Sequence, residues 1–263
     1  MKVVMITGAS RGLGEALAKH LMESEDQCHL ICIARNVNRD LQTLAAKKRI
    51  KLDFLQADLA RVENLEDLMV KAFYLIDKEK VTGLYLVNNA GTVEPIAPLA
   101  KVAALDLQHS VMINLAAPLA LSAAFIRQSQ SFRVEKRVVT ITSGASKRAV
   151  EGWSVYCSTK AGVNLFTACA AAEESDQPYG VQLAAFSPGV MDTDMQRIIR
   201  SSRKEDFRQL DDFIRFKKEG VLRSPALVAE KLSEVMFAPD FPNGAFVDLK
   251  DLLSPDLTET PER

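Results

Sequence analysis

The sequence predicts a single α/β domain built on a doubly wound parallel sheet. Short runs rich in β-branched residues alternate along the chain with longer segments whose apolar residues recur at helical spacing. The chain has 263 residues, which is enough to bury one large core, and it contains no internal repeat. Strands that alternate with helices are joined by right-handed crossovers, so they run parallel with helices on both faces of the sheet. Ligands of such folds bind outside the carboxyl ends of the strands, and function is expected there.

Seven strands follow from this pattern. They are Val3–Thr7, His29–Ala34, Leu52–Gln56, Gly83–Asn88, Arg137–Thr142, Val181–Ser187 and Ala245–Asp248. The clearest helical segments are Glu15–Glu23, Val62–Lys80 and Val155–Glu173. Residues 1–253 are expected to form the domain, and the polar, proline-containing segment 254–263 a fraying tail. Segment 194–220 contains two charged amphipathic helical pieces, which form either a solvated helical pair or a lid over a substrate.

Composition argues against several classes of partner. The formal charge is -1, with 48% apolar and 25% charged residues, so neither nucleic acid nor an anionic membrane is an expected partner. The four cysteines lack CxxC spacing and the three histidines are scattered, which predicts reduced thiols and no metal site. Met1 leads directly into the first strand with no signal-peptide pattern, so a cytoplasmic location is expected.

The stretch "VVMITGASRGLG" places three glycines, Gly8, Gly12 and Gly14, between the first strand and the first helix. Glycines at this point permit a tight turn and let a pyrophosphate approach backbone N–H groups at the helix N-terminus. The alternative is that they serve only the tight turn. Because this is the first strand-to-helix turn of an alternating chain, a dinucleotide-binding loop is favoured.

The end of the second strand indicates which dinucleotide is bound. An acidic residue there would hold the ribose 2′-hydroxyl of NAD, but this chain has Arg35. A guanidinium suits a 2′-phosphate, and Arg11 in the glycine loop can approach the same group. Unless both are ordinary surface arginines, these residues predict NADPH as the cofactor.

Tyr156 and Lys160 are four residues apart in a helical pattern, so their side chains emerge on one face of the helix. A tyrosine ordinarily titrates near pH 10, and a nearby ammonium would lower its pKa. We therefore expect Lys160 to tune Tyr156 as an acid-base catalyst. Such pairs also occur by chance on exposed helices, but Ser143 at the end of the fifth strand strengthens the functional interpretation.

Several motifs occur in order along the chain. They are "TGASRGLG" at 7–14, "ADL" at 57–59, "NNAG" at 88–91, Ser143 with Tyr156 and Lys160, and "SPGVMDT" at 187–193. Together they resemble the short-chain dehydrogenase/reductase family over essentially the whole chain. Within it, "IARN", "GWSVYCSTKA", "PGVMDTDMQ" and "NGAFVDL" are similar to the sepiapterin and benzil reductases. The resemblance implies an NADPH-dependent carbonyl reductase acting on a small diketone or a pterin side-chain ketone.

The resemblance also implies roles for individual residues. Tyr156 would protonate the carbonyl oxygen, Ser143 would hydrogen-bond it, Lys160 would also hold the nicotinamide ribose, and Asn114 would keep a water for proton relay. The cofactor-binding residues would be Gly8, Ser10, Arg11, Gly12, Leu13, Gly14, Arg35, Asn36, Asp58, Leu59, Asn89, Ala90, Gly91, Tyr156, Lys160, Pro188, Gly189, Val190 and Thr193. The substrate would meet Ser143, Tyr156, Trp153 and Asp248, although Trp153 could equally be core and Asp248 a surface carboxylate.

Two other functions remain open at this point. One is a reductase of 3-ketoacyl groups on acyl-carrier protein, which would want a basic docking surface at the pocket rim. The other is a dinucleotide sensor without turnover, which would have no need of a tuned proton donor. A small-molecule substrate and a homodimer or homotetramer are expected, because helices Ala103–Phe125 and Val155–Ala172 are too apolar for one sheet face to cover.

Overall fold

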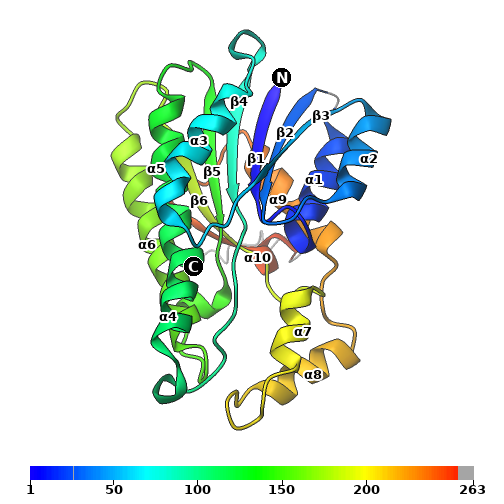
Figure 1. The fold of residues 1–263 in the computed structure, drawn as a ribbon, viewed down its shortest axis with the longest axis vertical. Coiled ribbons are helices and arrows are strands. Elements are labelled where there is room, and N and C mark those ends of the chain that lie inside the picture. Colours follow the sequence, from blue (N-terminus) through cyan, green and yellow to red (C-terminus); the bar gives the residue numbers. More distant parts are fainter. Residues whose placement is uncertain (26, 254–263) are drawn as a thin grey trace, which may run out of the picture.

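A parallel sheet runs through the centre of this computed structural model, which describes residues 1–25 and 27–253 (Figure 1). Its strand order is β3-β2-β1-β4-β5-β6-β7, and every neighbouring pair is parallel. The strands are β1 (Lys2–Thr7), β2 (Cys28–Ala34), β3 (Lys51–Gln56), β4 (Gly83–Asn88), β5 (Glu135–Ile141), β6 (Gln182–Ser187) and β7 (Phe246–Asp248). All seven predicted strands are present within two residues of their expected bounds, and the doubly wound fold is confirmed.

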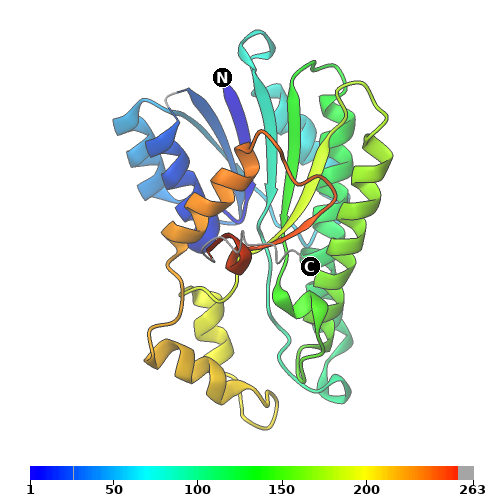
Figure 2. The same ribbon diagram turned by 180° about the vertical axis from the view of Figure 1, so that it is seen from behind.

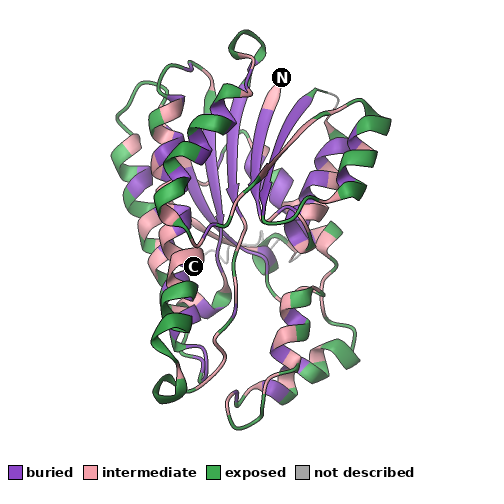
Figure 3. Ribbon diagram, viewed as in Figure 1, coloured by how far each residue is buried: buried purple, intermediate pink, exposed green. Residues whose placement is uncertain are grey.

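Helices cover both faces of this sheet, as Figures 1 and 2 show from opposite sides. One face carries α1 (Gly12–Ser24), α2 (Arg39–Lys48) and α9 (Pro225–Phe237), and the other carries α3 (Leu65–Tyr74), α5 (Ala117–Ser129) and α6 (Ser154–Glu174). Successive side chains of a strand point to opposite faces, so in β1 Val4 and Ile6 enter one core while Val3 and Met5 enter the other. The central strands are therefore mostly apolar and buried (Figure 3).

The strand order reverses between β1 and β4, which are neighbours in the sheet. From β1 the chain winds outward through β2 to β3, and from β4 it winds the other way through β5 to β7. The connections after β1 and β4 therefore leave toward opposite faces, and a crevice opens between them at the carboxyl ends of the strands. The glycine loop, the NNAG segment and the loop after β6 therefore lie together at the carboxyl edge of the sheet.

Several helices extend beyond that edge, at the bottom of Figure 1. They are α4 (Ala104–Val111), α7 (Asp194–Arg200) and α8 (Leu210–Lys218), whereas the short α10 (Leu249–Leu253) lies near the middle of the molecule. The predicted helix Ala103–Phe125 is present as α4 and α5 joined by a π-helical turn at Met112–Ala116. Segment 194–220 contains α7 and α8. The expected helix Val62–Lys80 is shorter, because two 3₁₀ turns flank α3. The tail predicted at 254–263 lies outside the described residues.

Candidate active site

The structure brings Ser143, Tyr156 and Lys160 together at the carboxyl end of β5. Ser143 follows that strand and caps a 3₁₀ helix at Gly144–Lys147, with its hydroxyl accepting a hydrogen bond from the Ala145 N–H. Tyr156 and Lys160 lie on consecutive turns of α6, and both are buried. The Lys160 ammonium is 5.9 Å from the centre of the Tyr156 ring. The four-residue spacing therefore produces the arrangement that the sequence predicted.

The side chain of Lys160 is fixed by a hydrogen bond to the backbone of β5. Its Nζ donates a hydrogen bond to the carbonyl of Ile141 at 2.7 Å, and the Thr142 hydroxyl donates to the carbonyl of Lys160. Burial lowers the pKa of Lys160 to about 8, because a buried ammonium is deprived of hydration. The amine therefore keeps its proton at neutral pH but lies close to the range in which it can release it.

The Tyr156 phenol differs from the sequence expectation. Burial raises the pKa of Tyr156 to about 12, and its hydrogen bond with Ser143 acts in the opposite direction. We expected Lys160 to lower this pKa, but that ammonium points to the Ile141 carbonyl and desolvation of the phenol outweighs its influence. In the structure the phenol is therefore firmly protonated at neutral pH, which suits a proton donor better than a base.

Asn114 lies in the π-helical turn between α4 and α5, a kind of irregularity that is frequent at functional sites. Its side-chain amide donates to the Thr92 carbonyl at 2.8 Å and its carbonyl accepts from the Thr92 N–H at 2.9 Å. A Cβ added at Gly91 would lie 3.1 Å from the Asn114 Oδ1 and 3.7 Å from the Lys160 Nζ. Asn114 thus holds the NNAG segment beside Lys160, and the lack of a side chain at Gly91 permits this close approach.

The glycine loop has the geometry of a phosphate-binding turn. Gly8 and Gly12 adopt the left-handed region, with φ of +67° and +60°. A Cβ at Gly14 would lie 2.5 Å from the Gly8 carbonyl oxygen, so only glycine allows this close approach. Arg11 occupies the N-cap position of α1 without giving a side-chain hydrogen bond to it. The helix therefore presents N–H groups and the positive end of its dipole to this edge, and it fits an anionic diphosphate.

Asn89 and Ala90 tie the ends of β1 and β4 together. Both backbone N–H groups donate to the Thr7 hydroxyl, and the Asn89 amide donates to the Thr7 carbonyl at 2.9 Å. Asn38 makes a comparable tie, because its amide donates to the Ser10 carbonyl while its oxygen caps α2. Thr7 and Asn38 were not among the predicted site residues. An asparagine directly before a helix signals an N-cap, and the added bond to the glycine loop is visible only in the structure.

Arg35 and Asn36 follow β2 and are exposed. The Arg35 backbone carbonyl accepts a hydrogen bond from Gln56, while its guanidinium has no ion pair with any residue the structure describes. Asp58 is also exposed and accepts from the Ala60 N–H, whereas Leu59 beside it is buried. The predicted adenosine-side residues therefore lie at the carboxyl ends of the adjacent strands β2 and β3, and the Arg35 guanidinium is available to a ligand.

Arg11 has a partner that the sequence did not predict. Its guanidinium lies 3.0 Å from the carboxylate of Asp194, the first residue of α7. Both side chains are about half exposed, so the pair contributes little stability and water or a ligand can replace it. It nevertheless shows that the glycine loop and segment 194–220 meet across this edge.

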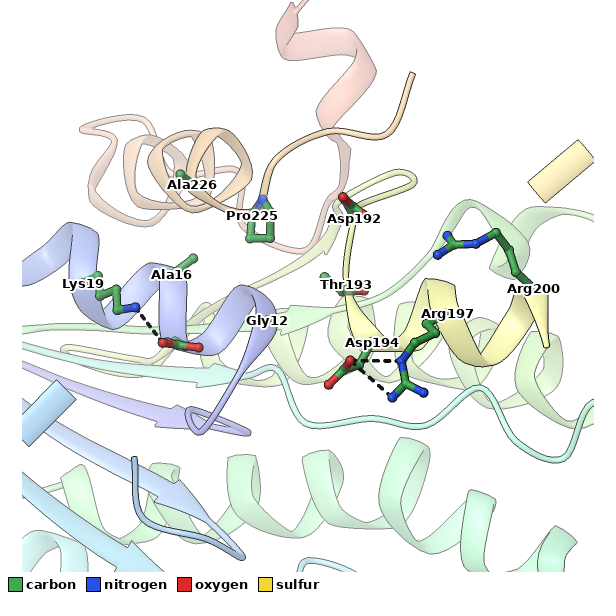
Figure 4. Close-up of a pocket in the computed structure, with 11 residues that line it drawn as sticks. Gly12, Ala16, Lys19, Asp192, Thr193, Asp194, Arg197, Arg200, Pro225 and Ala226 are labelled. Carbon is green, nitrogen blue, oxygen red and sulfur yellow. Dashed lines mark hydrogen bonds and ion pairs between the residues drawn. The ribbon is translucent and has the colours of Figure 1, made fainter. Parts of the chain in front are cut away.

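The loop after β6 lies against the glycine loop. Pro188 is buried, Gly189 has a φ of +67°, and Val190 accepts a backbone hydrogen bond from Arg223. A Cβ at Gly12 would lie 3.7 Å from the Thr193 methyl group. Thr193, Asp194 and Gly12 border a cavity of about 570 Å³ between α1, α7 and the start of α9, shown in Figure 4. The predicted cofactor residues of the first and sixth strand ends thus lie together.

Of the predicted substrate residues, Trp153 contacts Tyr156, whereas Asp248 makes its contacts elsewhere, at the end of β7. Trp153 is buried and its ring stacks on Phe207 with centroids 4.8 Å apart, and it also contacts the rings of Tyr156 and Phe213. Trp153 therefore links α6 to segment 194–220 as part of an aromatic cluster beside Tyr156. Asp248 pairs in register with Ser187 at the end of β7, and its carboxylate accepts from the Lys250 N–H.

The far turn of segment 194–220 is fastened to the loop before α6. Phe207 is fully buried, and a Cβ at Gly152 would lie 2.3 Å from the Asp206 carbonyl oxygen. Asp206 pairs with Lys101 at 2.7 Å and Arg208 with Glu151 at 3.2 Å. In the described residues, no group of three or more histidine, cysteine, aspartate or glutamate side chains could hold a metal ion.

Comparison with known proteins agrees with this geometry. A sequence profile for the family described as short chain dehydrogenase matches residues 2–204. The chain is 42% identical to a benzil reductase ((S)-benzoin forming) of Bacillus cereus, covering 95% of this chain and 100% of that protein. It is 38% identical to the Bacillus subtilis benzil reductase (96% and 100%) and 28% identical to mouse sepiapterin reductase (95% and 97%).

Solved structures show the same fold. The enzyme KRED1-Pglu matches with a TM-score of 0.81 at 25% identity, covering 94% of this chain and 100% of that one. A short-chain dehydrogenase/reductase from Saccharomyces cerevisiae matches with the same TM-score and identity, covering 94% and 96%. The matched residues include the glycine loop, Ser143, Tyr156 and Lys160. The chain is therefore an oxidoreductase of the short-chain dehydrogenase/reductase family.

Proposed function

We propose that this protein is an NADPH-dependent carbonyl reductase that reduces one carbonyl of a small aromatic α-diketone. The observation that carries the proposal is the group of Ser143 with the buried Tyr156 and Lys160 next to an aromatic cluster. Full-length similarity to benzil reductases supports the diketone, and weaker similarity to sepiapterin reductases makes a pterin side-chain ketone the second candidate. Neither a 3-ketoacyl thioester nor a purely sensing role is favoured by these relatives.

The chemistry required of the chain is proton donation to a carbonyl oxygen. Tyr156 is protonated at neutral pH, since burial raises its pKa to about 12, and its phenol gives the proton to that oxygen. The Ser143 hydroxyl donates a hydrogen bond to the same oxygen as negative charge develops there. When bound, the dinucleotide supplies the hydride that reduces the carbonyl carbon. Lys160 stabilises the phenolate that Tyr156 becomes, and Asn114 keeps the NNAG segment beside that lysine.

Arg35 and Arg11 are the basis for proposing NADPH. The Arg35 guanidinium at the end of β2 has no ion pair with the described residues, so a 2′-phosphate would be its partner. Arg11 exchanges Asp194 for the same phosphate in this proposal, because the existing pair is exposed and weak.

We further propose that segment 194–220 covers the substrate and that the protein forms a cytoplasmic homodimer or homotetramer. Leu105 on α4 and Leu165 on α6 are 77% and 69% exposed. The stretch Ala104–Ser129 is long and apolar enough to span a membrane by length and composition alone, but 44% of its apolar 18-residue window is buried within the fold. A partner copy that covers the exposed faces of α4 and α6 accounts for the two exposed leucines. Light scattering should give a mass well above the monomer's 29.0 kDa, and a monomer at micromolar concentration would contradict the assembly.

A substrate panel tests the proposed activity. Loss of NADPH would be followed with benzil, 1-phenyl-1,2-propanedione, sepiapterin and an acetoacetyl thioester. We expect the highest kcat/KM with one of the two diketones. Preference for sepiapterin would transfer the assignment to the second candidate. Turnover of the thioester alone, or of none of the four, would contradict the proposal.

A further inference from the structure

Arg223 lies in the connection between α8 and α9, far along the chain from every predicted cofactor residue. Its backbone is nevertheless joined to the loop after β6. The Arg223 N–H donates to the Val190 carbonyl at 3.0 Å, and the Asp192 N–H donates to the Arg223 carbonyl at 3.0 Å. A parallel bridge pairs Met191 with Arg223. The residue is therefore fixed to the loop that borders the cofactor crevice.

The guanidinium of Arg223 lies directly against Gly189. A Cβ built on Gly189 would lie 2.5 Å from the Arg223 Nη1 and 3.7 Å from its Cζ. Gly189 itself has a φ of +67°, so both its conformation and its lack of a side chain admit the cation at this point. The side chain of Arg223 thus occupies the space into which a side chain at position 189 would project.

This guanidinium has no hydrogen bond or ion pair with any residue in 1–25 or 27–253. It is half-buried, and a cation in such a place is ordinarily paired. The two carboxylates of the loop that Arg223 bridges have other partners, since Asp192 pairs with Lys217 at 2.7 Å and Asp194 with Arg11 at 3.0 Å. The described residues therefore leave the Arg223 guanidinium available to an anionic ligand.

The position of Arg223 indicates which anion. The glycine loop and the loop after β6 meet at Gly12 and Thr193, and α1 presents its uncapped N-terminus there. A diphosphate at that N-terminus would lie beside the loop after β6, which also carries Gly189. We propose that Arg223 binds the nicotinamide-side phosphate of the dinucleotide, from the side opposite α1. This inference rests on the proposed NADPH function.

Calorimetric binding tests this without requiring turnover. The variants are Arg223→Gln and Arg223→Lys, with Arg215→Gln as the matched control, because Arg215 is an exposed arginine of α8 paired with Asp212. The probes are NADP⁺ and adenosine 2′,5′-bisphosphate, which lacks the nicotinamide-side phosphate. We expect Arg223→Gln to raise the Kd of NADP⁺ about tenfold or more, with a smaller rise for Arg223→Lys. The bisphosphate should bind all variants within about twofold of wild type, and Arg215→Gln should match wild type with both probes.

Three results would overturn the inference. They are an unchanged Kd of NADP⁺ in Arg223→Gln, an equal loss of affinity for the bisphosphate, which would indicate a general disturbance of the loop, and an equal loss in Arg215→Gln. If Arg223→Gln does not fold, Arg223→Lys provides the same comparison. Wild-type affinity of Arg223→Lys for both NADP⁺ and the bisphosphate would then count against the proposal. Failure of the wild-type protein to bind either probe would instead contradict the NADPH assignment.

Discussion

The two ends of the central sheet treat charged side chains in opposite ways. At the amino end, Arg137 is 3% exposed and is bonded to Glu135, Gln182 and the Met236 carbonyl, while Tyr85 donates to Glu135. At the carboxyl end, the Arg35 and Arg223 guanidinium groups have no partner among the described residues. The amino end is a finished structural network. The carboxyl end leaves charge and helix N-terminal groups for a ligand to complete, which is how function differs from stability in this fold.

Replacing one tyrosine at each end separates the two roles most strongly. Tyr156→Phe keeps the ring but removes the proton donor, so kcat should fall by about 10²–10⁴ while the Kd of NADPH stays within a few-fold. Tyr85→Phe, at the amino end, should leave kcat within about twofold and reduce thermal stability, because Glu135 loses its donor. Steady-state kinetics with a deuteride isotope effect decide the point. If Tyr156→Phe keeps more than about a tenth of its turnover while chemistry is rate-limiting, another group supplies the proton.

Arg137 provides the strongest test of the amino end. Arg137→Leu removes two hydrogen bonds, to Gln182 and the Met236 carbonyl, and the ion pair with Glu135, which keeps its hydrogen bond from Tyr85. The free energy of unfolding should fall by about 2–4 kcal/mol in urea titration, with kcat/KM nearly unchanged. Lys231→Met, which breaks an exposed pair with Glu234 on α9, should cost less than about 1 kcal/mol. Equal losses in the free energy of unfolding for the two substitutions would show that the buried network stabilises the fold no more than an exposed ion pair does.

Arg35 tests whether an unpaired cation at the carboxyl end is reserved for the cofactor. Arg35→Ala should raise the KM for NADPH about tenfold or more, since a charge-assisted contact is worth about 1.5–3 kcal/mol, and should leave the KM for NADH nearly unchanged. Arg49→Ala removes an exposed arginine at the opposite end of the molecule and should change neither. Equal losses with NADPH and NADH would remove Arg35 from 2′-phosphate recognition.

The smallest expected effect concerns His29, a buried residue near the amino end. Burial lowers the pKa of His29 below its usual value, and the hydrogen bond with Asp53, at 2.7 Å, opposes this shift. The unfolded chain therefore binds a proton at this histidine more readily than the folded chain does. The contribution of His29 to the free energy of unfolding is complete above about pH 6.5 and is lost as the pH falls from there toward the lower pKa of the folded state. His29→Gln should flatten this decline by on the order of 1 kcal/mol, as measured by urea titration at several pH values. An unchanged slope would assign the pH dependence to other groups.

The contrast between the two ends also explains what the sequence could predict. Strand ends, the glycine loop and the spacing of Tyr156 and Lys160 are local patterns, and the structure places all of them together. The Asn114–Thr92 hydrogen bonds, the Arg11–Asp194 pair and the contact of Arg223 with Gly189 join separate parts of the chain, so no local pattern contains them. The raised pKa of Tyr156 was missed for the same reason, because desolvation depends on everything packed around the ring.

The contacts that hold segment 194–220 in place affect how product would leave the proposed active site. Its far turn is held by Phe207 stacked on Trp153, and the ring of Trp153 contacts that of Tyr156 with centroids 5.4 Å apart. If segment 194–220 opens as a lid, as proposed above, its outward swing would have to separate Phe207 from Trp153 and would loosen the packing around Tyr156. In that proposed motion, product release and disorder at Tyr156 would occur together, because the ring of Trp153 contacts both residues.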